Sequence, residues 1–112
     1  MQSVGQWINL HARQRPAKVA VVDDRRRLTY AELDRQTDAL AAALAARGVR
    51  PGDRIGILAG ASVEWVLVYL SIIKLGAIAT ALNYRETPDR LIAMMQSVGV
   101  SLLFTDAGSR GG

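Results

Sequence analysis

A chain of 112 residues with a net charge of +4 and no cysteine is long enough for one domain, and it excludes disulfide bonds, thiolate metal sites and a cysteine nucleophile. Half of its residues are hydrophobic and 21% are charged, which excludes a disordered chain. The first residues lack the order of a basic and then an apolar stretch, so we expect no secretory signal and a cytoplasmic protein.

Arginine carries most of the positive charge, and its one run of three is Arg25–Arg27, which follows Asp23 and Asp24. Two acids beside three bases between short apolar segments are typical of a solvated hairpin turn. No nucleic-acid-binding motif or interleaved aromatic residues accompany the run. We therefore expect no nucleic-acid partner.

The first elements are predicted to be a helix and a hairpin. Apolar residues within 3–14 form an imperfect helical face that ends before Pro16. His11 lies on this helix without a serine or an acid at a useful spacing, so we expect it to be an exposed or packing side chain rather than a catalytic one. The segments 18–22 and 27–29, joined by a short polar turn, predict a β-hairpin.

A helix over about 30–47 has a signal at each end. Thr29 and Glu32 form a capping box, in which each side chain accepts a hydrogen bond from the other residue's backbone N–H. Gly48 suits the left-handed conformation that ends a helix. A stripe at three- and four-residue spacing predicts the core-facing side, and it comprises Leu33, Thr37, Leu40, Ala41 and Leu44. The short apolar run at 53–58 then predicts a buried strand.

The helix predicted at 63–75 is apolar nearly all round, so we expect it to be heavily buried. A membrane span from Trp65 to Leu82 is barely long enough. Lys74 would lie within it, at a cost of about 3 kcal/mol on insertion scales. Gly76 also suits a helix end before a strand at 77–81, so we expect no membrane span.

Thr87 as a cap, Pro88 at the first position and Gly99 at the end predict another helix, followed by a strand at 100–105. Met94 and Met95 are interpreted as core filler on that helix. The alternation of strands and helices from 53 to 105 predicts βαβ units with a parallel sheet. The expected fold is thus α/β, with a helix and hairpin leading an incomplete piece of a larger layered domain.

Catalytic or metal-binding residues do not emerge from these patterns. Gly56 and Gly60 have neither of the common phosphate-loop spacings, so a turn that lets Ser62 cap the next helix is favoured over a phosphate site. The carboxylates are each expected at a cap, a turn or an outer face, and they are Glu32, Asp34, Asp53, Glu64, Glu86 and Asp89. No acid–base pair or metal site is therefore predicted.

Three segments carry a family resemblance: LTYAEL at 28–33, GVRPGDRIGIL at 48–58 and SIIKLGAIATALNYR at 71–85. They resemble the beginning of the adenylate-forming ligases, which include acyl-CoA synthetases, luciferases and peptide-synthetase adenylation domains. The resemblance covers about 7–106. Ala81 stands where many members have proline. Asn83-x-Arg85 is similar to acid–CoA ligases, since peptide adenylation domains usually carry aspartate at the first position.

The resemblance implies an enzyme of fatty-acid metabolism that activates a carboxylic acid with ATP and Mg²⁺ as an acyl-adenylate, and then transfers the acyl group to coenzyme A. It places the phosphate-binding loop, the metal-binding glutamate and the catalytic lysine beyond these residues. We therefore expect 1–106 to be the N-terminal portion of the ligase domain, with no cofactor bound by this chain alone, and 107–112 to be a frayed or truncated tail.

Arg85 is the one candidate binding residue. It follows a predicted strand end, where ligand crevices of open α/β sheets form. The resemblance implies a position near the phosphates of the coenzyme A nucleotide. A solvated loop arginine, or an ion pair with Glu86 or Asp89, is the alternative.

Three functions remain open: an inactive fragment of an acid–CoA ligase, one piece of a split ligase, or a non-catalytic interaction module. The coding sequence beyond Gly112 would separate them. The expected partners are the remainder of a ligase chain or a second copy. Unpaired strand edges and part of the helix at 63–75 are expected to lie uncovered in an incomplete layered piece.

Overall fold

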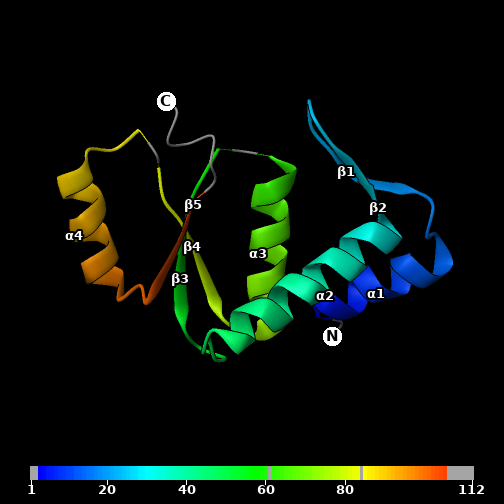
Figure 1. Ribbon diagram of the computed structural model, residues 1–112, viewed down its shortest axis with the longest axis horizontal. Coiled ribbons are helices and arrows are strands. Elements are labelled where there is room, and N and C mark those ends of the chain that lie inside the picture. The colour runs from blue at the N-terminus through cyan, green and yellow to red at the C-terminus, as the bar shows by residue number, and fades with distance from the viewer. Residues whose placement is uncertain (1–2, 61, 84, 106–112) are drawn as a thin grey trace.

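The computed structural model describes residues 3–60, 62–83 and 85–105 and shows a mixed α/β architecture (Figure 1). Each predicted helix and strand is present, with ends within two residues of those expected. The elements are α1 (Val4–Gln14), β1 (Val19–Val22), β2 (Arg27–Thr29), α2 (Tyr30–Ala46), β3 (Arg54–Leu58), α3 (Val63–Leu75), β4 (Ile78–Ala81), α4 (Pro88–Val98) and β5 (Leu102–Thr105).

The signals at both ends of α2 are confirmed. Thr29 Oγ1 accepts from Glu32 N at 3.2 Å, and Glu32 Oε1 accepts from Thr29 N at 2.9 Å. At the other end Gly48 has φ 95°, and Val49 folds back so that its N–H donates to Leu44 O at 3.1 Å. These two caps fix where α2 begins and ends, and so fix the direction in which the chain enters β3.

The hairpin is antiparallel, as predicted, with an irregularity between Val19 and Val21 that the sequence did not indicate. Its one deeply buried side chain, Leu28, packs in a small core with Ile8 of α1 and Leu33 of α2. Val63 and Leu67 of α3 complete this core. The N-terminal helix and hairpin are therefore attached to the rest of the chain through the first halves of α2 and α3.

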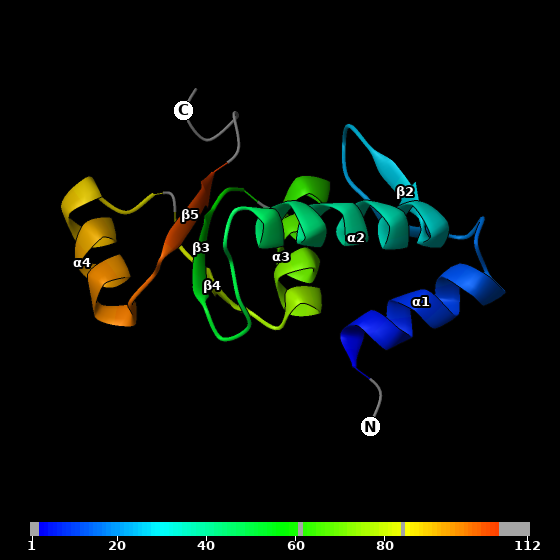
Figure 2. The same cartoon turned by 60° about the horizontal axis from the view of Figure 1, so that its bottom comes forward.

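The second sheet is parallel, in the order β4-β3-β5. Both views place α2 and α3 on one side of this sheet and α4 on the other (Figures 1 and 2). The larger core lies between the sheet and the two helices, and its buried members are Leu44, Val49, Ile55, Ile57, Ala59, Val68, Ile72 and Ala77. Of its strands, β3 is central, and its residues 55–57 are buried, as the apolar run after Arg54 predicts.

The other face of the sheet is covered only in part. Helix α4 has no buried side chain among its described residues, and Ile92 and Met94 are 49% and 39% exposed. The prediction that Met94 fills a core is therefore wrong, because no opposing layer reaches it among the described residues. Ile78 and Leu103 of the sheet are also exposed.

Helix α3 is covered better than expected. Five of its side chains are buried, namely Val63, Leu67, Val68, Ser71 and Ile72. The expectation that this helix leaves an apolar face open is thus largely wrong, because α1 and α2 pack on it; the open apolar surface lies on α4 instead. Within the described ranges, no helix combines the length and hydropathy needed to cross a bilayer.

Candidate functional site

The carboxyl ends of the three parallel strands lie at one edge of the sheet. Ile57 near the end of β3 pairs with Ala81 of β4, and Leu58 pairs with Thr105 of β5. Ligands of open α/β sheets bind outside such an edge. In Figure 1 this is the upper edge, where the chain leaves β3 for α3 and leaves β4 for α4.

The chain that follows β4 forms a tight turn held by Asn83. The side-chain Oδ1 of Asn83 accepts from Arg85 N at 2.9 Å, and its backbone O accepts from Glu86 N at 3.0 Å. Glu86 in turn pairs with Arg90 Nε of α4 at 3.0 Å. Arg85 is exposed, so the structure places this cation on the turn beside the ligand edge of the sheet. Its role remains a prediction.

The start of α3 does not provide a free anion site. Ser62 Oγ caps the helix by accepting from Trp65 N at 3.1 Å, as predicted. Asp23 Oδ2 accepts from Val63 N at 2.8 Å, so a carboxylate already occupies the helix N-terminus. Gly56 lies within β3, where a Cβ would approach Leu82 Cδ1 to 3.0 Å. This glycine therefore serves close packing rather than phosphate binding.

Asp23 has a larger role than the solvated turn expected of it. Besides Val63 N, its carboxylate accepts from Arg25 N and Arg26 N, each at 2.8 Å. These backbone hydrogen bonds, that of Val63 foremost, hold the pKa of Asp23 below its ordinary value. Since Val63 is 40 residues further along the chain, the spacing in the sequence gave no sign of this contact.

Arg26, the middle of the basic run, is also directed inward. Its Nη1 lies 2.8 Å from Glu64 Oε1 of α3, and its Nη2 donates to Gln36 Oε1 of α2 at 3.0 Å. The hydrogen bond from Arg26 lowers the pKa of Glu64. Asp23 and Arg26 together therefore bind the hairpin turn to α3.

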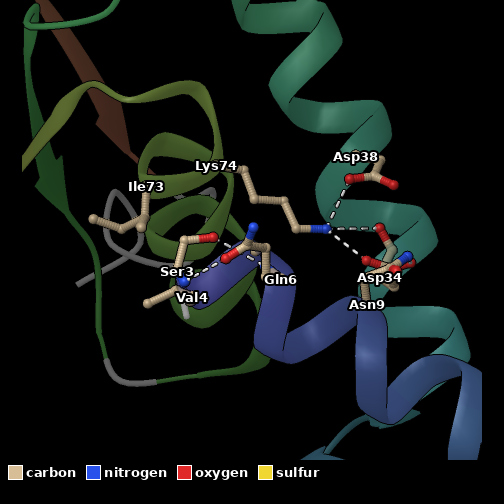
Figure 3. A pocket seen from close by; sticks show the side chains of 9 residues that line it. Ser3, Val4, Gln6, Asn9, Asp34, Asp38, Ile73 and Lys74 are labelled. Carbon is tan, nitrogen blue, oxygen red and sulfur yellow. Dashed lines mark hydrogen bonds and ion pairs between the residues drawn. The ribbon is translucent and has the colours of Figure 1, made fainter. Parts of the chain in front are cut away.

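A polar cavity of about 370 Å³ lies between α1, α2 and α3 (Figure 3). Its lining includes Lys74, whose side chain is only 8% exposed. The ammonium Nζ donates to Asp34 Oδ1 at 2.8 Å, to Asp38 Oδ1 at 2.7 Å and to Asp34 O at 3.2 Å. All three N–H donors of Lys74 thus have an acceptor.

This cluster is a structural tie between α2 and α3 and not a reactive centre, because a charged, fully hydrogen-bonded lysine is a poor nucleophile. It corrects the expectation that Asp34 lies on an outer face. His11 packs, as expected, with ring centroids 4.0 Å from Trp7 and 5.1 Å from Tyr30. Across the residues that the structure describes, no group of three histidine or acidic side chains is placed to hold a metal ion.

Comparison with known proteins identifies a family and several similar enzymes. Residues 8–111 match the family described as AMP-binding enzyme. A fatty acid–[acyl-carrier-protein] ligase of Streptomyces coeruleorubidus is 32% identical over 95% of this chain and 20% of its own. A 3-hydroxybenzoate–CoA/4-hydroxybenzoate–CoA ligase of Thauera aromatica is 39% identical over 80% of this chain and 17% of its own. The inhibitor-bound N-terminal domain of FACL13 from Mycobacterium tuberculosis superposes with a TM-score of 0.90 at 28% identity, covering 97% of this chain and 28% of that one.

The fold and these matches define a part of the adenylate-forming enzymes, and the chain belongs to the AMP-binding enzyme family. It corresponds to part of the N-terminal region of such enzymes. It spans about a fifth of the length of the two curated relatives.

Proposed function

We propose that this chain is the N-terminal portion of an AMP-forming acid–CoA ligase and that it is inactive without the rest of the enzyme. The observation that supports coenzyme A as the acceptor of the acyl group is the Asn83–Arg85 turn, which follows the carboxyl end of β4. The hydroxybenzoate–CoA ligase supports it, whereas the acyl-carrier-protein ligase shows that relatives use another acceptor. Fatty acids as substrates belong to the same proposal and are supported by the name of the fatty acid–[acyl-carrier-protein] ligase. The proposed location is the cytoplasm.

The described residues do not fit ATP and Mg²⁺. Polyphosphate binding requires a cradle of backbone N–H groups and cations, together with a metal. Here Asp23 and Ser62 already accept the N–H groups of Val63 and Trp65 at the start of α3, and no acidic cluster for a metal is found among the described residues. We therefore assign the binding of ATP and Mg²⁺ to the rest of the ligase, and to this chain the scaffold of the sheet.

Arg85 fits one part of coenzyme A. A guanidinium is the side chain best suited to bind phosphate oxygens in pairs, and Arg85 is exposed on a turn that Asn83 holds. When bound, coenzyme A supplies the thiol that accepts the acyl group. The role proposed for Arg85 is to bind and orient a phosphate of its nucleotide, away from the reacting atoms.

The test uses the ligase chain that contains these residues, with the two half-reactions measured separately. We expect Arg85→Gln to raise the KM for coenzyme A about tenfold or more, the worth of a hydrogen bond to a charged group. Pyrophosphate exchange, which reports adenylation, should not change. Arg90→Gln, which removes an exposed cation from α4, is the matched control and should leave both reactions as they are.

The proposal for Arg85 fails if its substitution leaves the KM for coenzyme A unchanged. The choice of acceptor fails separately if the ligase transfers acyl groups to a phosphopantetheinyl carrier protein and not to coenzyme A.

A further inference from the structure

The hairpin lobe carries a row of exposed cations and valines that its packing leaves unused. We name it the cationic ridge, and its members are Arg15, Lys18, Val19, Val22, Arg25 and Arg27. All six are exposed, and Val22 is 63% exposed, the largest fraction among the exposed large hydrophobic side chains.

Hydrogen bonds and strand pairing hold these residues next to one another. Lys18 N donates to Arg15 O at 3.1 Å, and Val22 is the cross-strand partner of Arg27. Strict alternation would place Val19 and Val22 on opposite faces of the strand. The irregularity between Val19 and Val21 inserts the extra residue that returns both to one face. Val19, Val22 and Arg27 therefore share one face of the hairpin, and Arg15, Lys18 and Arg25 lie in the segments just outside its two strands.

The positive charge of the ridge is not neutralised by the fold. The ion pairs within the described ranges involve Arg26, Lys74 and Arg90, and none of the four ridge cations. The carboxylate of Asp23, in the same turn, is directed to three backbone N–H groups. In the segment 15–27, Asp24 is the one exposed acid, against the four exposed cations of the ridge.

We propose that the cationic ridge docks on an anionic lipid bilayer surface. Anionic headgroups attract each basic side chain that lies near them, and exposed valines between the cations gain by entering the headgroup boundary. Beside the ridge, a cavity of about 350 Å³ is lined mostly by valines (Val21, Val22, Val63 and Val66, with Asp23 and Ser62) and offers space for an apolar group. A nucleic acid would engage the cations without burying the valines, so the lipid surface is favoured over a simple polyanion.

This inference goes beyond the proposed ligase function and does not depend on it. The experiment sediments the 112-residue chain with vesicles of phosphatidylcholine, with and without phosphatidylglycerol, and subtracts the protein that pellets without lipid. Binding is expected only with phosphatidylglycerol and should weaken as salt is raised. Removing two ridge cations in Lys18→Gln/Arg27→Gln should weaken it about 25-fold, at roughly fivefold per cation.

The matched control is Arg47→Gln/Arg50→Gln, which lowers the net charge equally at the other end of α2 and should lose much less binding. A third variant, Val22→Thr, keeps the charge and the shape and should reduce the binding that persists at high salt. All five positions are exposed, and circular dichroism checks that each variant is folded.

Three results would overturn the proposal. The first is the absence of binding to phosphatidylglycerol vesicles. The second is an equal loss of binding in the control and ridge variants, which would indicate net charge alone. The third is an unchanged Val22→Thr together with full competition by heparin, which would identify a general polyanion site instead of a lipid surface.

Discussion

The ammonium of Lys74 on α3 lies 2.8 Å from the carboxylate of Asp34 on α2, and the lysine side chain is 8% exposed while that of Asp34 is 16% exposed. This ion pair joins two helices that cover the same face of the sheet. Asp38, which also accepts from Lys74, is 65% exposed. We therefore expect the carboxylates of Asp34 and Asp38 to contribute unequally to the free energy of unfolding.

Removing the lysine should cost more stability than removing the exposed carboxylate. We expect Lys74→Met to lower the free energy of unfolding by about 2 kcal/mol, because Asp34 loses its charged donor while it is partly buried. Asp38→Asn, the control, should cost less than about 1 kcal/mol, since an exposed ion pair is screened by water. Urea denaturation of both variants measures the difference, and equal losses would show that burial of Asp34 does not matter.

The helix caps allow a second paired test. Thr29→Ala should cost about 1 kcal/mol, the usual loss for a helix cap, because it opens the capping box of a helix that belongs to both cores. Thr87→Ala removes the cap of α4 and should change the unfolding midpoint less, since α4 buries no side chain among its described residues. If the Thr87 variant loses as much as the Thr29 variant, α4 is packed more firmly than its exposure indicates.

The lowered pKa of Asp23 predicts how the stability of the fold depends on pH. The N–H groups of Val63, Arg25 and Arg26 hold its pKa below the ordinary value of 3.8, so the folded state favours the carboxylate. This stabilisation is present above that value and is lost as the pH falls through the lower folded-state pKa. We expect Asp23→Asn to be less stable than the parent at neutral pH, and the difference to narrow in acid. Urea titrations across pH test this, and a difference that stays constant with pH would contradict it.

Local signals predicted the fold well because each lies within a few residues. The capping box of Thr29 and Glu32, the left-handed Gly48 and the cap at Ser62 are all where the sequence placed them. The strand order β4-β3-β5 and the irregularity in β1 were not predicted, since they depend on how distant segments pair.

The functions of individual polar residues were harder to predict. Asp23 was expected in a solvated turn and Asp34 on an outer face, yet their partners Val63 and Lys74 each lie 40 residues away. Met94 was expected to fill a core, as methionine often does, but a helix side chain is buried only if another layer covers it. Contacts over such separations leave no periodic signal in one sequence.

The open surfaces of the sheet and α4 predict self-association of the isolated chain. Strands β4 and β5 are the edges of the parallel sheet in the described structure, and unpaired strand edges template association. Exposed Ile92 and Met94 add apolar surface on α4. We expect light scattering to show oligomers or aggregates. A single monomeric species with a cooperative melt above ~60 °C would instead favour an autonomous interaction module.

The most direct test of the central claim is whether these 112 residues alone can activate a carboxylic acid. Titration of the isolated chain with ATP and magnesium should give no detectable binding heat. The residues that the structure describes offer no phosphate cradle and no acidic metal cluster. Pyrophosphate exchange across several carboxylic acids should stay at background. Exchange above background with any acid would contradict the account and show that adenylation does not need the rest of the ligase.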